Sequence, residues 1–318
     1  MITAIFLLLL GLALLIVGAE SLVRGAASLA KRWGVSTLVI GLTIVAFGTS
    51  SPELIVNIVS AAKGTADIAV GNILGSNIAN ILLILGISSF IRPMEVKRQT
   101  VWREIPFAIL AAVLIVIMGN DIFFDGSAIN AITRTDGFTL MAVFFIFMFY
   151  AFSVSRVEGD QGEDVKTYPS GTSALLILGG LIGLYFGGQL LVDNAVTLAR
   201  LAGLSEAIIG LTVVAVGTSL PELATSVVAA ARGHNDIAIG NIVGSNIFNV
   251  FWVLGLTAVI LQIPFSGTIT FDAIFAAGVT ILLFLAMFVG KKNQLTRWEG
   301  TTFLLLYVLY ISYLVYRG

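Results

Sequence analysis

Residues 41–54 read GLTIVAFGTSSPEL, and 169 positions later residues 210–223 read GLTVVAVGTSLPEL. The match continues without a gap, because DIAVGNILGSNIAN at residues 67–80 aligns with DIAIGNIVGSNIFN at residues 236–249. More than half of the positions from Gly41 to Gly86 are identical to their partners, and the identities include Pro, Glu, Asp and Asn. Shared composition alone would give scattered Gly and Leu matches, so the chain contains a true internal repeat.

The composition around this repeat is too apolar for a water-soluble domain. The chain has 318 residues, of which 58% are hydrophobic and 11% are charged, and its mean hydropathy is +1.03. Apolar runs of membrane-spanning length fall at residues 2–18, 36–62, 66–91, 104–119, 137–155, 173–192, 205–231, 236–262, 271–290 and 300–316. The first run has no basic segment before it and has a counterpart in mid-chain, so we expect a membrane helix there and not a signal peptide.

Several functional classes are excluded or disfavoured by composition. The 17 basic residues are scattered and form no dense basic face, so no nucleic-acid partner is expected. The absence of Cys excludes disulfides, thiolate metal sites and Cys nucleophiles. The only His, His234, falls in a short predicted loop. We therefore expect a protein that is not an enzyme.

The longest connector, residues 156–172, carries four carboxylates and indicates a solvated linker. It separates a first five-helix repeat, residues 1–155, from a second, residues 173–318. Because five is odd, the second half must enter the membrane upside down relative to the first. Alternating loops then place thirteen of the 17 basic residues in the cytoplasm if both termini are outside the cell membrane and the linker is cytoplasmic.

The predicted fold is therefore an all-α integral membrane protein with ten transmembrane helices, arranged as two inverted five-helix repeats with broken helices at the midplane. This architecture is typical of transporters.

Glu53 and Glu222 fall near the centres of the second and seventh apolar runs. An ionisable group at that depth costs about 2.5–3.5 kcal/mol even on the lenient insertion scale, so something must offset the cost. Pro52 and Pro221 directly precede the two glutamates. A proline inside a helix removes one N–H and collides with the carbonyl four residues before it, so we expect both helices to be broken here. Backbone carbonyls that lose their helical hydrogen bond at this depth must be buried in protein or line a cavity.

The repeated Ser-x-x-Glu pattern, Ser50 to Glu53 and Ser219 to Glu222, also fits a capping box that restarts a helix. Capping does not explain why a helix is interrupted twice in mid-membrane. The polar groups in these segments form an all-oxygen set, which suits calcium best and lets sodium use subsets of the same ligands. The set comprises the two glutamates, the hydroxyls of Thr49, Ser50, Thr218 and Ser219, freed carbonyls, and the amides of Asn80 and Asn249.

Two further asparagines share a helix face with these amides. Asn77 lies three residues before Asn80, and Asn246 three residues before Asn249. The ordinary interpretation of an asparagine inside a membrane is a hydrogen bond between helices, and this interpretation stays open for Asn77 and Asn246. The glycines one turn apart on the same helices indicate close helix packing.

The paired Gly-Thr-Ser-x-Pro-Glu motifs, each followed by Gly-Ser-Asn-Ile-x-Asn, resemble the two alpha repeats of the calcium/cation antiporter superfamily. The resemblance covers the whole chain and is greatest to the prokaryotic sodium/calcium exchangers. It implies that Glu53 and Glu222 are central calcium ligands, joined by backbone oxygens at Thr49 and Thr218. It also implies sodium sites at Ala46, Ser50, Ala215, Ser219, Ser76 and Ser245, with Asn80 and Asn249 completing the centre.

The resemblance implies exchange of calcium for sodium by alternating access, with the first and sixth spans moving across a rigid core. The expected partners are inorganic cations, calcium and sodium with protons or potassium as further candidates, and the lipid bilayer. No cofactor and no protein partner are expected.

Many sodium/calcium exchangers have Asp where this chain has Asn249, which leaves two formal negative charges in the site. A proton/calcium antiporter using the same glutamates therefore stays open, as does a cation channel.

Overall fold

The computed structural model describes residues 1–62, 66–154, 166–202 and 215–317, which form helices and four strands of two residues each. Within these ranges, eight helices are long and apolar enough to cross a membrane. A ninth span is formed if the bent pair Thr37–Thr49 and Ser51–Ala62 is counted as one. The molecule is therefore a multi-pass helical membrane protein. The span expected at residues 205–231 lies partly outside the described residues, so the count of ten stays a prediction.

The elements up to residue 154 are α1 (Ile2–Trp33), α2 (Thr37–Ile40), the π-helix η1 (Gly41–Val45), α3 (Ala46–Thr49), α4 (Ser51–Ala62), α5 (Ala66–Ala79), the π-helix η2 (Asn80–Leu85), α6 (Gly86–Ile91), β1 (Met94–Glu95), α7 (Arg98–Trp102), α8 (Glu104–Met118), α9 (Asp121–Asp125), β2 (Ala131–Ile132) and α10 (Arg134–Val154). Those from residue 170 are α11 (Ser170–Leu201), α13 (Ala215–Gly217), α14 (Leu220–Arg232), α15 (Asn235–Phe248), the π-helix η4 (Asn249–Leu254), α16 (Gly255–Ile260), β3 (Ile263–Pro264), α17 (Gly267–Ala286), β4 (Gln294–Leu295) and α18 (Arg297–Arg317). Most of the expected linker lies outside the described residues.

Helix α1 is longer than the apolar run at residues 2–18 predicts. It continues until Gly34, whose left-handed backbone (φ 64°) ends the helix. Glu20 and Arg24, which follow the apolar run, lie within the helix one turn apart, and their side chains pair at 2.6 Å. Most residues after this pair are small or apolar and buried, so the helix is continued by packing.

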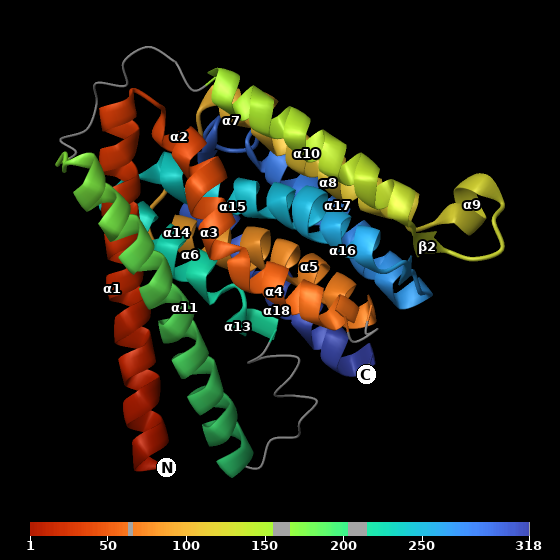
Figure 1. Ribbon diagram of the computed structural model, residues 1–318, viewed down its shortest axis with the longest axis horizontal. Coiled ribbons are helices and arrows are strands. Elements are labelled where there is room, and N and C mark those ends of the chain that lie inside the picture. The colour runs from red at the N-terminus through yellow and green to blue at the C-terminus, as the bar shows by residue number, and fades with distance from the viewer. Residues whose placement is uncertain (63–65, 155–165, 203–214, 318) are drawn as a thin grey trace.

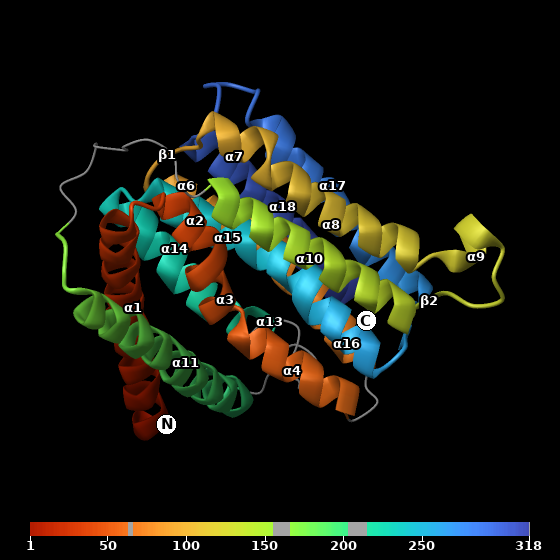
Figure 2. The same cartoon turned by 45° about the horizontal axis from the view of Figure 1, so that its top comes forward.

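Helices α1 and α11 pack against each other in opposite directions, to one side of the bundle that contains α8, α10, α15 and α17 (Figures 1 and 2). The contact is backbone to backbone. A Cβ atom added at Gly18 would lie 2.8 Å from the nitrogen of Leu184, and one at Gly180 would lie 2.7 Å from the oxygen of Gly18. Gly11, seven residues before Gly18 in α1, and Gly187, seven residues after Gly180 in α11, meet in the same way. Small residues thus allow two long helices to touch closely in lipid.

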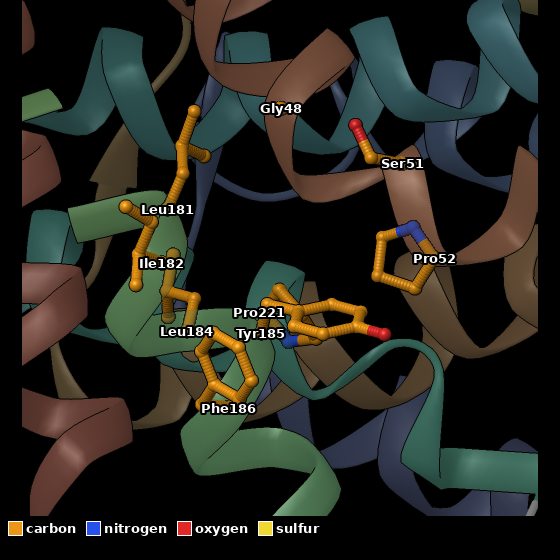
Figure 3. A pocket seen from close by; sticks show the side chains of 9 residues that line it. All are labelled: Gly48, Ser51, Pro52, Leu181, Ile182, Leu184, Tyr185, Phe186 and Pro221. Atoms are coloured by element: carbon orange, nitrogen blue, oxygen red, sulfur yellow. The ribbon is translucent and has the colours of Figure 1, made fainter. Parts of the chain in front are cut away.

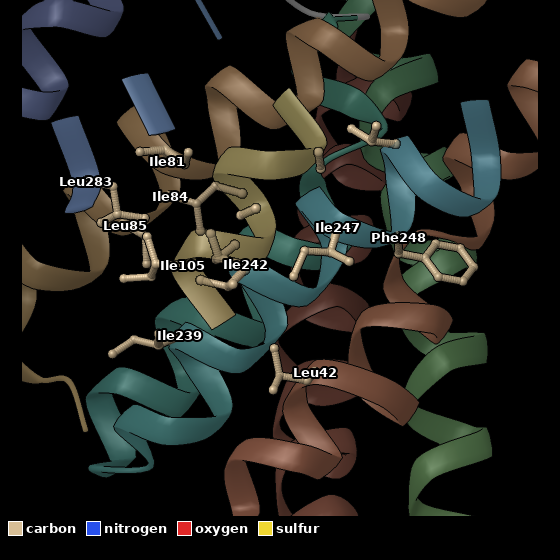
Figure 4. Packing of buried hydrophobic residues seen from close by; sticks show 14 of the residues in the cluster. Leu42, Ile81, Ile84, Leu85, Ile105, Ile239, Ile242, Ile247, Phe248 and Leu283 are labelled. Atoms are coloured by element: carbon tan, nitrogen blue, oxygen red, sulfur yellow. The ribbon is translucent and has the colours of Figure 1, made fainter. Parts of the chain in front are cut away.

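The most buried helices are α5 and α15 with the segments that continue them. In their most apolar stretches 72% and 83% of residues are buried, against at most 44% in the other spans. Figure 4 shows Ile242 and Ile247 of α15 among the core side chains, with Ile81 and Ile84 of η2 and Leu42 of η1. The two halves of the repeated sequence therefore share one core.

Two short antiparallel strand pairs tie distant connections together. β1 pairs with β4, placing Met94 opposite Leu295, and β2 pairs with β3, placing Ile132 opposite Ile263. Each pair joins a connection from before residue 154 to one from after residue 170. Helix α9 lies beyond the ends of α8 and α10 in both views (Figures 1 and 2).

Candidate cation site

The first repeated motif interrupts its helix where the sequence predicts. Helix α3 ends at Thr49, Ser50 leaves the helical conformation (φ -82°, ψ 6°), and α4 starts at Ser51 with a bend of 45°. Pro52 lies in the first turn of α4, where its missing N–H has no helical partner to lose. Glu53 follows in the same turn, where the positive end of the helix dipole favours a carboxylate.

The second motif repeats this geometry. Helix α13 ends at Gly217, Ser219 has nearly the same backbone angles as Ser50 (φ -87°, ψ 6°), and α14 starts at Leu220. Pro221 and Glu222 occupy its first turn. The local sequence thus gives two broken helices, each of which points its N-terminal end and one carboxylate into the protein.

The two carboxylates belong to one buried site. Glu53 and Glu222 are each 1% exposed. The Ser50 hydroxyl, from the first break, donates to Glu222 Oε1 at 3.0 Å. Among the described residues, no basic side chain forms an ion pair with either glutamate. Two buried carboxylates without such a partner are costly, which indicates a site for a cation.

Serines on the neighbouring helices also contact the carboxylates. Ser76 of α5 donates to Glu53 Oε1 at 3.4 Å, and Ser245 of α15 donates to Glu222 Oε1 at 3.3 Å. Each serine lies 23 residues after its glutamate, so this contact is repeated in both halves. The serine of the Gly-Ser element therefore lies beside the carboxylate in both halves.

Asn80 and Asn249 lie on the same two helices and are buried. The Asn80 amide donates to Asn246 Oδ1 at 2.9 Å, and the Asn249 amide donates to Asn77 Oδ1 at 3.1 Å. All four asparagines thus lie where α5 and the start of η2 meet α15 and the start of η4. Both π-helices of these segments start at the site, η2 at Asn80 and η4 at Asn249. Such widened turns occur often at functional sites.

Five buried oxygen atoms in this region accept no hydrogen bond from any described residue, and the Ser219 hydroxyl donates none. They are Glu53 Oε2, Glu222 Oε2, Asn80 Oδ1, Asn249 Oδ1 and Ser219 Oγ. Unpaired buried acceptors are rare in folded proteins and call for an explanation. All five are hard oxygen donors, which sodium and calcium prefer. The donor set present therefore fits a hard cation.

The threonines of the motif are held by asparagines from the opposite half. The Thr49 hydroxyl donates to Asn241 Oδ1 at 3.0 Å, and the Thr218 hydroxyl donates to Asn72 Oδ1 at 3.3 Å. The same hydroxyls lie near the opposite carboxylates, Thr49 near Glu222 and Thr218 near Glu53. The sequence interpretation missed Asn72 and Asn241, although both match in the repeat and lie in apolar runs.

The two alanines of the expected sodium sites lie before the breaks. Ala46 is buried at the start of α3, and its carbonyl accepts the Ser50 N–H at 3.0 Å and the Thr49 hydroxyl at 3.4 Å. Ala215 is the first residue of α13. The structure thus brings the expected site residues of both halves to the two breaks and the helices beside them. Their roles as ligands stay predictions.

A cavity of about 200 Å³ lies between α11 and the two breaks (Figure 3). Its walls include Pro52 and Pro221, each the neighbour of a site glutamate. The opposite wall is apolar and comes from α11 through Leu181, Ile182 and Tyr185. Helix α11 therefore forms the wall of this cavity that faces the two breaks.

The chain is similar to known proteins over nearly its whole length. The family model "Sodium/calcium exchanger protein" matches residues 3–153 and 172–316. The sodium/calcium exchanger MaX1 of Methanosarcina acetivorans is 31% identical over 99% of this chain and all of its own length. The putative antiporter CaxA of Alkalimonas amylolytica is 36% identical over the full length of both chains. A solved structure of the sodium-calcium exchanger NCX_Mj superposes with a TM-score of 0.84, 31% identity and coverage of 98% of both chains.

These matches span nearly the whole chain and both copies of the motif, and the relatives they name are transporters. They confirm the resemblance inferred from the paired motifs. The chain belongs to the sodium/calcium exchanger protein family of transmembrane cation antiporters.

Proposed function

We propose that this protein exchanges calcium for sodium across the cell membrane by alternating access. The observation that carries the proposal is the set of unpaired buried oxygens around Glu53 and Glu222, because it combines two carboxylates with neutral donors from both halves. The names of the relatives MaX1 and NCX_Mj, both sodium/calcium exchangers, support the same pair of ions.

The ligands are divided between the two ions. Calcium is held by the carboxylates of Glu53 and Glu222, the backbone oxygens of Thr49 and Thr218, and the centre formed with Asn80 and Asn249. Sodium ions use the carbonyls of Ala46 and Ala215 and the hydroxyls of Ser50, Ser219, Ser76 and Ser245. Because the two sets overlap at the carboxylates, calcium and sodium compete and do not bind together.

Exchange, as opposed to simple leakage, follows from electrostatics. A carrier that changes its access while empty would have to enclose two carboxylates with no counter-charge, and an uncompensated buried charge costs several kcal/mol. One calcium ion or two sodium ions neutralise the pair. The protein therefore changes access only when loaded, and each turnover returns one kind of ion for the other.

We propose ten spans in two inverted repeats, residues 1–155 and 173–318, joined by a cytoplasmic linker at residues 156–172, with both termini outside the cell. The opposite directions of α1 and α11 and the reciprocal contacts of the asparagines support this arrangement. Single cysteines test it cleanly, because the chain has none. A cysteine at Gly162 should be labelled only from the cytoplasm and one at Gly318 only from outside. The reverse pattern would invert the topology.

Transport is tested with purified protein in liposomes, by uptake of radioactive calcium under three conditions. Sodium inside and none outside should drive uptake, whereas a pH gradient without sodium and the absence of any gradient should not. Uptake that depends on the pH gradient and not on sodium would replace this proposal by proton/calcium antiport. That alternative stays open because Asn249 is neutral. Uptake with no counter-ion at all would indicate a channel.

A further inference from the structure

The amides of Asn77 and Asn246 meet face to face in the core. Asn77 Nδ2 donates to the backbone oxygen of Asn246 at 3.3 Å, and Asn246 Nδ2 donates to the backbone oxygen of Asn77 at 3.2 Å. This exchange fixes the rotation of both side chains, because the NH₂ end of an asparagine donates and the oxygen end only accepts. The oxygen end of each side chain is then left for another partner.

That partner is the amide of the opposite helix's second asparagine. Asn246 Oδ1 accepts from Asn80 Nδ2 at 2.9 Å, and Asn77 Oδ1 accepts from Asn249 Nδ2 at 3.1 Å. With their NH₂ ends engaged, Asn80 and Asn249 present the oxygen end elsewhere. Those two oxygens are among the buried atoms that accept no hydrogen bond from the described residues.

We propose that Asn77 and Asn246 are positioning residues that determine which end of the Asn249 and Asn80 amides faces the transported cation. The inference rests on the proposed function, since it concerns binding of calcium at that site. Neither Asn77 nor Asn246 touches the ion. Each acts by accepting the hydrogens of the amide whose oxygen is a ligand.

The physical reason is the difference between the two ends of an amide. A hard cation is bound by oxygen and repelled by the partial positive charge of an NH₂ group. A flipped Asn80 would turn that group toward the cation and would set its own oxygen against Asn246 Oδ1. Asn246 therefore penalises the wrong orientation and stabilises the right one. Without it, Asn80 would populate both orientations, and part of the calcium affinity would be lost.

A purely structural role, in which Asn77 and Asn246 only join two helices, makes a different prediction. A carboxylate has oxygen at both ends, so the side chain introduced by Asn80→Asp cannot be misoriented. In that background the acceptor at position 246 has no hydrogen to receive and faces an oxygen instead. Removing Asn246 should then be harmless to binding if its role is positioning, and as harmful as before if its role is structural.

The test is a double-mutant cycle on the full-length protein in detergent, with calcium binding measured by calorimetry for wild type, Asn246→Ala, Asn80→Asp and the double variant. Asn246→Ala should raise the calcium Kd about 10-fold when Asn80 is present, which corresponds to about 1.4 kcal/mol and lies within the range for one buried hydrogen bond. It should change Kd less than about 2-fold in the Asn80→Asp background. An equal factor in both backgrounds would overturn the proposal.

Two further measurements separate binding from folding. The symmetric cycle of Asn77→Ala with Asn249→Asp gives the same test should Asn246→Ala not fold. Thr257→Val is the matched control: Thr257 is buried in α16 and donates only to the backbone oxygen of Val253 at 2.7 Å, so the variant should change the melting temperature and affect Kd equally in both backgrounds.

The outcome also distinguishes this inference from the proposed function, because calorimetry needs no counter-ion. If the wild type binds calcium but Asn246→Ala changes Kd by the same factor in both backgrounds, the positioning role is contradicted and the proposed function is not. If the two substitutions act non-additively on calcium Kd as expected, but sodium does not drive calcium transport, then sodium coupling is contradicted and the positioning role is not. Failure of the wild type to bind calcium contradicts both.

Discussion

The two breaks have nearly the same sequence and the same serine backbone, yet their contacts differ. At the first break the Ser50 N–H bonds the carbonyl four residues back and its hydroxyl donates to Glu222. At the second break the Ser219 N–H bonds Val216, three residues back, and its hydroxyl has no partner among the described residues. A nearly symmetric sequence therefore holds an asymmetric site. Inverted repeats serve alternating access in this way, because the access paths on the two sides of the membrane differ at any moment.

The similarity of the two halves is broken most severely at the carboxylates. Glu53→Gln or Glu222→Gln removes half of the charge that balances calcium, so each variant should lose calcium exchange by about 100-fold or more, in line with a loss of about 3–5 kcal/mol for one partner of a buried charge pair. Initial rates of sodium-driven calcium uptake measure this, with the melting temperature as the check on folding. Near-normal uptake by either folded variant would remove that glutamate from the site.

The difference between the two serines predicts different effects on stability. In protein free of sodium and calcium, Ser50→Ala removes a donor to a buried carboxylate and should lower the free energy of unfolding by about 1.5–3 kcal/mol. Ser219→Ala removes a hydroxyl that makes no hydrogen bond in the described structure, so its effect should be near zero or slightly stabilising. Chemical unfolding in detergent compares the two variants. Equal losses in the free energy of unfolding would mean that the two serines contribute equally to stability despite their different contacts.

At the asparagine positions of the site the two halves are alike, because Asn249 is neutral like its repeat partner Asn80, and the family resemblance marks Asn249 as a departure from many exchangers. With charge from Glu53 and Glu222 alone, each proton bound neutralises half of the site, so calcium affinity should fall as pH falls. Asn249→Asp adds a carboxylate and should increase affinity more at alkaline than at neutral pH. Calcium Kd measured from about pH 5 to 9, a range that covers the usual shifts of buried carboxylates, tests both statements. A flat wild-type profile would contradict proton competition.

The smallest expected effect concerns a contact between α1 and α14. Glu20 pairs with Arg24 at 2.6 Å and with Arg232 at 2.7 Å, whereas the matching position in the second half is Gln189. These side chains are 21–55% exposed, so Glu20→Gln should change the free energy of unfolding by about 1 kcal/mol or less. High salt should reduce even that difference. A larger loss that persists in salt would show that packing around Glu20 and not charge holds the helices together.

Much of the site could be predicted because strong local rules act on it. Proline next to glutamate in an apolar run predicts both a break and a buried carboxylate, and both breaks occur where Pro52 and Pro221 require them. The repeat predicts that the second break resembles the first. The family resemblance, carried by the same motifs, is confirmed by the comparisons.

Features that depend on distant partners were not predictable from the sequence. Asn72 and Asn241 resemble other asparagines in apolar helices, and only the packing of one half on the other brings them to Thr218 and Thr49. The strand pairs join connections about 130 to 200 residues apart and leave no local signal. The length of α1 was underestimated because charged residues usually end an apolar run, whereas an ion pair one turn apart lets the helix continue.

The central claim is that the two halves build one cation site between them, and the number of calcium ions bound tests it most directly. Calorimetry on sodium-free wild type should give one calcium per chain, and Glu53→Gln and Glu222→Gln should each abolish binding of that same ion. Two calcium ions per chain in wild type, with one retained in each variant, would mean a separate site in each half and would contradict the account.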